Sequence, residues 1–291
     1  MSGRNDAAAG EAASRDGASG VDNAIQLAIP LAIRAEIRAR LEAIEREEDA
    51  RILFAIESGS RAWGFPSPDS DYDVRFVYVR PLDQHLTLRE RRDVIERPID
   101  ADLDISGWDL KKALALLMKP NPVLLEWLSS PIRYRWDDAL CARLEALARR
   151  VAHGCACRHH YLGLGERNFR RNIADAERPQ LKKYFYALRP AMALRWLRMR
   201  PEEIPPMKLQ ALMAGVALAP DLAARLEALV ALKGETREMG DGERLADLDA
   251  FIKGEFALAR AALDAAPPAP EPPWAEAEAL FRAVVKGEAL S

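Results

Sequence analysis

The sequence contains few cysteines and no long apolar run. Only three of its 291 residues are cysteine, and such a small, odd number argues against a disulfide framework. No run approaches the roughly 18 consecutive apolar residues that a membrane-spanning helix needs. The first residues are rich in Ala, Gly, Ser and Asp and have no apolar core, so they do not resemble a secretory signal. These absences predict a cytoplasmic protein that contacts no membrane.

The sequence also lacks a strong net charge. Its formal net charge is −3, so no global basic field indicates nucleic-acid binding, and any contact with a polyanion must come from a local patch. Apolar residues make up 49% and charged residues 30% of the chain, as is usual for a globular protein. A chain of 291 residues is long enough for one large domain or two modest ones.

The distribution of apolar residues divides the chain into four regions. Residues 1–22 are small and polar without periodicity, which predicts a disordered tail. Residues 23–130 contain the segments with strand character, and residues 131–265 show almost continuous helical periodicity. Residues 266–291 combine a proline-rich linker with a short terminal helix. Strands first and helices afterwards predict an α+β fold with two lobes.

The pattern within the first lobe changes from helix to strand. Residues 29–46 carry apolar side chains at spacings of three and four, which predicts an amphipathic helix. The apolar run 52–56 predicts a buried strand, and 71–79 predicts a second. A third strand is expected over 101–106, with 94–97 as its hairpin partner. The helices expected afterwards cover 109–118, a segment capped by Asn121, 137–151, 155–173, 179–198, 206–214, 220–232 and 243–264.

Two aspartates stand two residues apart on the second expected strand. Because successive strand side chains alternate between faces, the carboxylates of Asp71 and Asp73 point the same way. These like charges repel each other, so they require a compensating cation, for which a divalent metal is the obvious choice. Asp104 on the third expected strand completes a three-carboxylate cluster if the two strands lie side by side.

The residue types in this pattern favour phosphate chemistry. Carboxylate oxygens are suitable ligands for Mg²⁺ (or Mn²⁺), which takes part of its coordination shell from substrate phosphates. Two such ions stabilise both the attacking and the leaving oxygen of a phosphoryl displacement. The turn at Gly59 and Ser60 offers amide N–H groups and a hydroxyl to a triphosphate. The sequence therefore predicts a site for two metal ions and a nucleoside triphosphate (NTP).

The order of these features resembles the DNA polymerase beta nucleotidyltransferase superfamily. More closely, the stretches 57–65 and 67–75 resemble the predicted nucleotidyltransferases associated with RNA repair. The stretches 104–110 and 183–190 resemble the same family, and the likeness extends over about residues 50–215. The resemblance implies a catalytic domain over 23–130, built as a small mixed sheet with flanking helices, and a C-terminal helical bundle.

The resemblance also implies a reaction and roles for individual residues. A nucleoside monophosphate passes from an NTP such as ATP to an acceptor hydroxyl, with RNA as the expected acceptor. Asp71, Asp73 and Asp104 are the implied metal ligands, and Asp104 is the implied activator of the acceptor hydroxyl. The residues implied to contact the nucleotide are Gly59, Ser60, Arg61, Lys183 and Tyr184.

Two other functions are compatible with the sequence. Transfer to a protein or a small molecule, as in antitoxin-like or antibiotic-modifying relatives, is mildly favoured by the near-neutral charge. A non-catalytic module that senses nucleotide is the alternative outside the enzymes. The presence of Asp71, Asp73 and Asp104 together argues against this last interpretation.

Several further patterns allow either a functional or a structural interpretation. The helix 179–198 carries basic and aromatic residues that could hold a triphosphate or stack on a base, or simply form a solvated face: Lys182, Lys183, Tyr184, Tyr186 and Arg189. The basic segment 158–171 could contact RNA phosphates or be an ordinary charged helix face. Cys155 and Cys157 have no common zinc-site spacing, so no zinc is expected there. Trp63 and Trp108 are expected to pack at the edge of the site.

Overall fold

The computed structural model describes residues 29–89, 91–100, 102–119, 121–151, 154–237, 239–266 and 270–290. The tail predicted over 1–22 lies outside the described residues, and so does the part 267–269 of the predicted linker. In the described part of the chain, no helix combines the length and apolar character that crossing a membrane requires.

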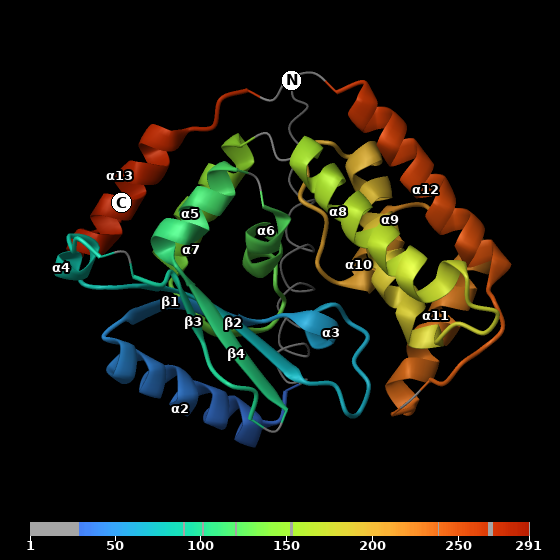
Figure 1. Cartoon of the computed structure of the whole chain (residues 1–291), viewed down its shortest axis with the longest axis horizontal. Coiled ribbons are helices and arrows are strands. Elements are labelled where there is room, and N and C mark those ends of the chain that lie inside the picture. The colour runs from blue at the N-terminus through green and yellow to red at the C-terminus, as the bar shows by residue number, and fades with distance from the viewer. Residues whose placement is uncertain are drawn as a thin grey trace, which may run out of the picture.

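A mixed β-sheet forms the centre of the first lobe (Figure 1). Within the described residues it has five strands in the order β3-β4-β2-β1-β5. Their bounds are β1 (Arg51–Glu57), β2 (Tyr72–Val79), β3 (Val94–Glu96), β4 (Leu103–Asp109) and β5 (Arg133–Trp136). β2 and β4 run parallel, whereas the other neighbours are antiparallel. This sheet with its flanking helices confirms the predicted α+β class.

Strand β5 is an element that the sequence pattern did not predict. It contributes only four residues, and it pairs along one edge with β1. Its side chains are mostly arginine and aromatic, and only Tyr134 is buried, so it lacks the apolar run of the central strands. Because β5 lies beyond residue 130, the sheet extends past the predicted end of the first domain.

Helices before, between and directly after the strands cover the sheet on both faces (Figure 1). Their bounds are α2 (Leu31–Glu48), α3 (Gly59–Ala62), α4 (Leu82–His85), α5 (Leu110–Met118), α6 (Pro122–Leu128) and α7 (Asp138–Arg150). Val74 and Phe76 of β2 pack with α2 on one face, whereas Val77 and Val79 join the larger core on the other. The predicted alternation is confirmed within β2, and Asp73 falls on the face opposite α2. Asp71, which was predicted to belong to this strand, instead precedes its first residue, Tyr72.

The second lobe consists of helices that pack around a buried central helix (Figure 1). Their bounds are α8 (Gly154–Phe169), the π-helical turn η1 (Arg170–Ala174), α9 (Leu181–Met199), α10 (Leu209–Gly215), α11 (Pro220–Glu235) and α12 (Ala246–Asp264). Helix α9 is the central one and contacts α8, α10 and α12. The terminal helix α13 (Trp274–Lys286) instead returns to the first lobe, where it packs on α5 and α7.

A buried polar network joins the two lobes. Glu126 on α6 accepts hydrogen bonds from Arg189 on α9 at 2.9 Å and from the Tyr161 hydroxyl on α8 at 2.8 Å. The Arg189 guanidinium also donates to the carbonyl of Met207 and lies 4.9 Å from the ring centre of Trp63. Arg189 is only 4% exposed, so it does not belong to an exposed basic face. The network fixes α9 against the first lobe.

We expect Glu126→Ala to lower the free energy of unfolding by about 3 kcal/mol, because it leaves the Arg189 guanidinium buried without its counter-charge. Urea unfolding followed by circular dichroism measures the loss. The matched control is Glu278→Ala, which removes an exposed ion pair with Arg282 and is expected to change stability by less than about 0.5 kcal/mol. Equal losses in the two variants would contradict a lobe-joining role for Glu126.

Candidate active site

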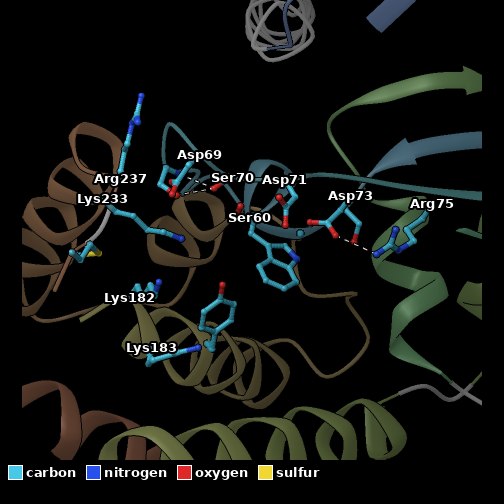
Figure 2. A pocket seen from close by; sticks show the side chains of 16 residues that line it. Ser60, Asp69, Ser70, Asp71, Asp73, Arg75, Lys182, Lys183, Lys233 and Arg237 are labelled. Atoms are coloured by element: carbon cyan, nitrogen blue, oxygen red, sulfur yellow. Dashed lines mark hydrogen bonds and ion pairs between the residues drawn. The ribbon is translucent and has the colours of Figure 1, made fainter. Parts of the chain in front are cut away.

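A cavity of about 490 Å³ lies between the first lobe and helices α9 and α11 (Figure 2). The first-lobe wall contains Ser58, Gly59, Ser60, Trp63, Ser67, Asp69, Ser70, Asp71, Asp73 and Arg75. The opposite wall contains Lys182, Lys183, Tyr186, Lys233, Arg237 and Met239. We call these the acidic wall and the basic wall, because three aspartates on the first face four cations on the second. The cavity thus concentrates both signs of charge in a chain that is almost neutral.

Gly59 allows the acidic wall to form. It follows the end of β1 and begins the short helix α3 with φ of +59°, a left-handed conformation that favours glycine. A Cβ atom at this position would lie 1.8 Å from Oδ2 of Asp73. The backbone before α3 therefore lies directly against the Asp73 carboxylate, and only a residue without a side chain fits between them.

The parallel pairing of β2 with β4 brings two predicted carboxylates together. Asp73 is the register partner of Asp104, as expected if the two strands were neighbours. Arg75, two residues further along β2, lies between them. Its Nη2 donates to Asp73 Oδ1 at 3.2 Å and to Asp104 Oδ2 at 2.6 Å. The cation that compensates this pair in the structure is thus a guanidinium of the chain itself.

The fit of the acidic wall to a metal ion is partial. Asp71 and Asp73 line the cavity, whereas Asp104 lies behind Arg75 and is not among the lining residues. Across the described residues, no group of three His, Cys, Asp or Glu side chains is arranged to hold a metal ion. Burial raises the pKa of Asp73, and the negative charges of Asp104 and Asp71 raise it further. The positive charge of Arg75 lowers this pKa and so offsets part of the shift. A divalent cation would relieve the same repulsion, and two hard oxygen donors face the cavity to receive it.

Glu57, at the end of β1, supports this arrangement from below and was not predicted. Its side chain is fully buried, and its Oε1 accepts the backbone N–H of Asp73 at 2.9 Å. The Tyr134 hydroxyl donates to Oε2 at 2.5 Å, and the Ser130 hydroxyl donates to the Glu57 carbonyl. Burial raises the pKa of Glu57 to about 7, although the hydrogen bonds from Tyr134 and Asp73 oppose the shift. Glu57 therefore holds the backbone of Asp73 in place.

Three of the residues predicted to contact nucleotide line the cavity, namely Gly59, Ser60 and Lys183. Arg61 instead donates to the carbonyls of Ser70 and Asp71, and its guanidinium lies 3.9 Å from the ring centre of Tyr72. It fastens the loop behind Asp71 and takes no part in lining the cavity.

Tyr184 also lies away from the cavity. It is fully buried, and its hydroxyl donates to Asp249 at 3.0 Å while it accepts the backbone N–H of Leu245. These bonds tie α9 to the start of α12. The contact of Tyr184 with nucleotide that the resemblance implied is therefore not supported, because the turn of α9 directs this side chain into the core.

The two tryptophans near the site differ in their surroundings. Trp108 packs on Trp127 with ring centres 4.1 Å apart, as expected for an edge of the core. Trp63 packs edge-on against Tyr186 at 6.2 Å and also lines the cavity. Among the described residues that line the cavity, none comes from the basic segment 158–171, so that segment belongs to a different surface.

Comparison with known proteins agrees with the first-lobe motifs. The model of a family described as "RlaP: RNA repair pathway DNA polymerase beta family" matches residues 33–283. The uncharacterized protein YcgL of Bacillus subtilis (strain 168) is 41% identical over 216 residues. That match covers 74% of this chain and 82% of the relative. The family match includes both walls of the cavity.

We expect Gly59→Ala to destabilise the protein by about 2 kcal/mol or more, because the left-handed backbone and the contact with Asp73 both oppose a Cβ. Gly240→Ala is the matched control, since Gly240 has φ of +63° but no atom within 4 Å of a built Cβ. Its expected cost is the backbone strain alone, about 1 kcal/mol. Chemical denaturation measures the free energy of unfolding of both variants. An equal loss at the two positions would show that the contact of a Cβ at residue 59 with Asp73 adds nothing to the backbone strain.

We expect Glu57→Leu to lower the free energy of unfolding by about 2 kcal/mol or more, because the Asp73 N–H and the Tyr134 hydroxyl lose a buried acceptor. Glu57→Gln keeps an oxygen acceptor for that N–H, so its expected loss is about 1 kcal/mol or less. Both values come from urea titration. If the glutamine variant were as unstable as the leucine variant, the hydrogen bond from the Asp73 N–H would not be the interaction through which Glu57 stabilises the fold.

Proposed function

The chain belongs to the RNA repair pathway DNA polymerase beta family, and from this premise we propose that it is a metal-dependent nucleotidyltransferase. It transfers a nucleoside monophosphate from an NTP to an acceptor hydroxyl and releases pyrophosphate. The observation that carries the proposal is a cavity that lies between an acidic and a basic wall. Carboxylates suit the metal ions, and the facing cations suit the phosphates.

The acidic wall is the proposed site of the metal and of the reacting phosphate. Asp71 and Asp73 would hold Mg²⁺ (or Mn²⁺), with two ions expected, and the metal would neutralise charge on the phosphates and polarise the reacting one. Gly59 and Ser60 offer a backbone N–H and a hydroxyl to the phosphates, and Lys183 adds a positive charge from the other wall. The pairing of these features in one cavity supports the assignment.

Asp104 is the proposed general base and third metal ligand, and it can serve in either role only after Arg75 leaves its Oδ2, because Asp104 lies outside the lining of the cavity. Its side chain is 31% exposed, and its Oδ2 accepts the hydrogen bond from Arg75. An acceptor hydroxyl that replaces the Arg75 donor at this oxygen would pass its proton to Asp104. The hydroxyl oxygen then bonds to the α-phosphorus, the bond from that phosphorus to the pyrophosphate oxygen breaks, and pyrophosphate leaves.

RNA is the proposed acceptor, because the family to which the chain belongs is described as acting in RNA repair. The local basic segment 158–171 on α8 and η1 is consistent with contact to a phosphate backbone. The net charge of −3 is the observation that favours a protein or a small molecule instead. The assay below therefore includes all three acceptor classes.

We expect the protein to incorporate label from an NTP into an RNA oligonucleotide in the presence of Mg²⁺ or Mn²⁺. The double variant Asp71→Asn/Asp73→Asn is expected to lose at least about a hundredfold of this rate, because it removes the negative charge that binds the metal. Asp221→Asn, which neutralises an exposed carboxylate in the first turn of α11, is the matched control and is expected to retain the rate.

The same assay with a denatured-protein extract and with small hydroxyl compounds identifies another acceptor class. Equal incorporation by wild type and double variant with every acceptor would contradict the catalytic assignment. NTP binding measured alongside then separates a nucleotide sensor from an inert protein.

A further inference from the structure

Lys233 is a buried cation that faces the cavity. It lies on α11 and is only 4% exposed, yet it is one of the lining residues and extends towards the acidic wall (Figure 2). Within the described residues, no carboxylate forms an ion pair with it and no oxygen accepts a hydrogen bond from it. Lysine is almost never fully buried without a partner, because an unpaired ammonium loses its hydration.

Aromatic rings hold the Lys233 side chain in place. Its Nζ lies 4.5 Å from the ring centre of Phe65, 5.4 Å from that of Phe185 and 6.0 Å from that of Tyr186. Phe65 and Phe185 stack on each other at 4.8 Å and are themselves buried, so these rings do not move freely. Contact with ring faces recovers part of the lost hydration. The rings offer no hydrogen-bond acceptor to the three N–H donors of the ammonium, which lies at the cavity.

The surroundings oppose the charge of Lys233. Burial and the nearby charge of Lys182 lower the pKa of Lys233 to about 8, and Asp69 only partly counteracts this. A leucine or a methionine would fill the same aromatic cradle without such a cost. A cation that is held rigidly, unpaired and directed into a cavity is suited to an anion that arrives from solution.

We propose that Lys233 is the anchor for the terminal phosphates of the incoming NTP, and that it lets the cavity select a polyphosphate over a single phosphate. This inference rests on the proposed function, which makes an NTP the substrate. Asp71 and Asp73 lie on one wall and Lys233 on the other, so a chain of phosphates that spans the cavity would contact both walls. A single phosphate at the metal contacts only the acidic wall. The released pyrophosphate carries the same phosphates and leaves from the same anchor.

The test compares nucleotide binding in Lys233→Met with binding in wild type. Methionine is long, flexible and apolar, so it keeps the contacts with the aromatic rings. Isothermal titration calorimetry with ATP, AMP and inorganic tripolyphosphate measures the affinities in Mg²⁺. We expect the variant to bind ATP and tripolyphosphate about ten- to a hundredfold more weakly, the range expected for lost charged hydrogen bonds, and AMP within about twofold of wild type.

A matched control lies on α12. Lys253 is also 5.4 Å from an aromatic ring centre, that of Phe169, but it is exposed and outside the cavity. Lys253→Met is expected to leave all three affinities unchanged. Melting temperature provides the second readout. Because the pKa of Lys233 is lowered in the folded state, its protonated form destabilises the fold at neutral pH, and Lys233→Met is expected to melt higher than wild type.

The outcomes distinguish this inference from the proposed function. Weaker binding of ATP and tripolyphosphate with AMP unchanged supports the anchor, whether or not wild type transfers label to any acceptor. Unchanged ATP affinity in Lys233→Met, or equal losses for ATP and AMP, overturns the anchor even where wild type is an active transferase.

Discussion

The parallel pairing of β2 with β4 is the constraint on which the site depends, because it sets Asp73 beside Asp104. Two carboxylates in register repel each other, and the surrounding structure responds to that repulsion. Arg75 bridges the two with its guanidinium, and Glu57 fixes the Asp73 backbone from the buried side. Gly59 lets the following turn lie against the carboxylate. Each of these contacts holds negative charge at the cavity, where a divalent cation and phosphates are expected to bind.

The helical lobe supplies the opposite charge and is held in place by buried contacts. The hydrogen bond between Glu126 and Arg189 fixes α9, and the stack of Phe65 on Phe185 continues the contact beside the cavity. Burying such polar and charged groups is costly unless they are paired. An arrangement of the two lobes that broke these pairs would therefore be less stable than the observed one. The net charge of −3 conceals this arrangement, since the two walls carry opposite charges.

The sequence predicted the parts of the site that depend on local structure. Strand alternation correctly puts Asp73 on the face opposite Val74 and Phe76, whereas Asp71 precedes β2 and yet lines the same cavity. The turn at Gly59 follows from glycine's backbone freedom. The strand pairing on which the approach of Asp104 depended is confirmed, but the predicted three-carboxylate cluster is not found among the described residues. Long-range packing decides the rest. Tyr184 lies on the same helix as Lys183 but points into the core. Nothing in the local sequence distinguishes Lys233 from a solvated helix residue, because the aromatic rings that surround it come from other elements. The edge strand β5 has too few apolar residues to be recognised.

The most direct measurement is a crystal structure of the full chain with Mn²⁺ and a non-hydrolysable NTP analogue, in which the anomalous signal of manganese locates the ions. Manganese bound to the carboxylates of Asp71 and Asp73, with the triphosphate between the acidic and basic walls, is the predicted result. A nucleotide outside this cavity, or manganese on carboxylates elsewhere in the chain, would contradict the assignment of the cavity as the nucleotidyl-transfer site.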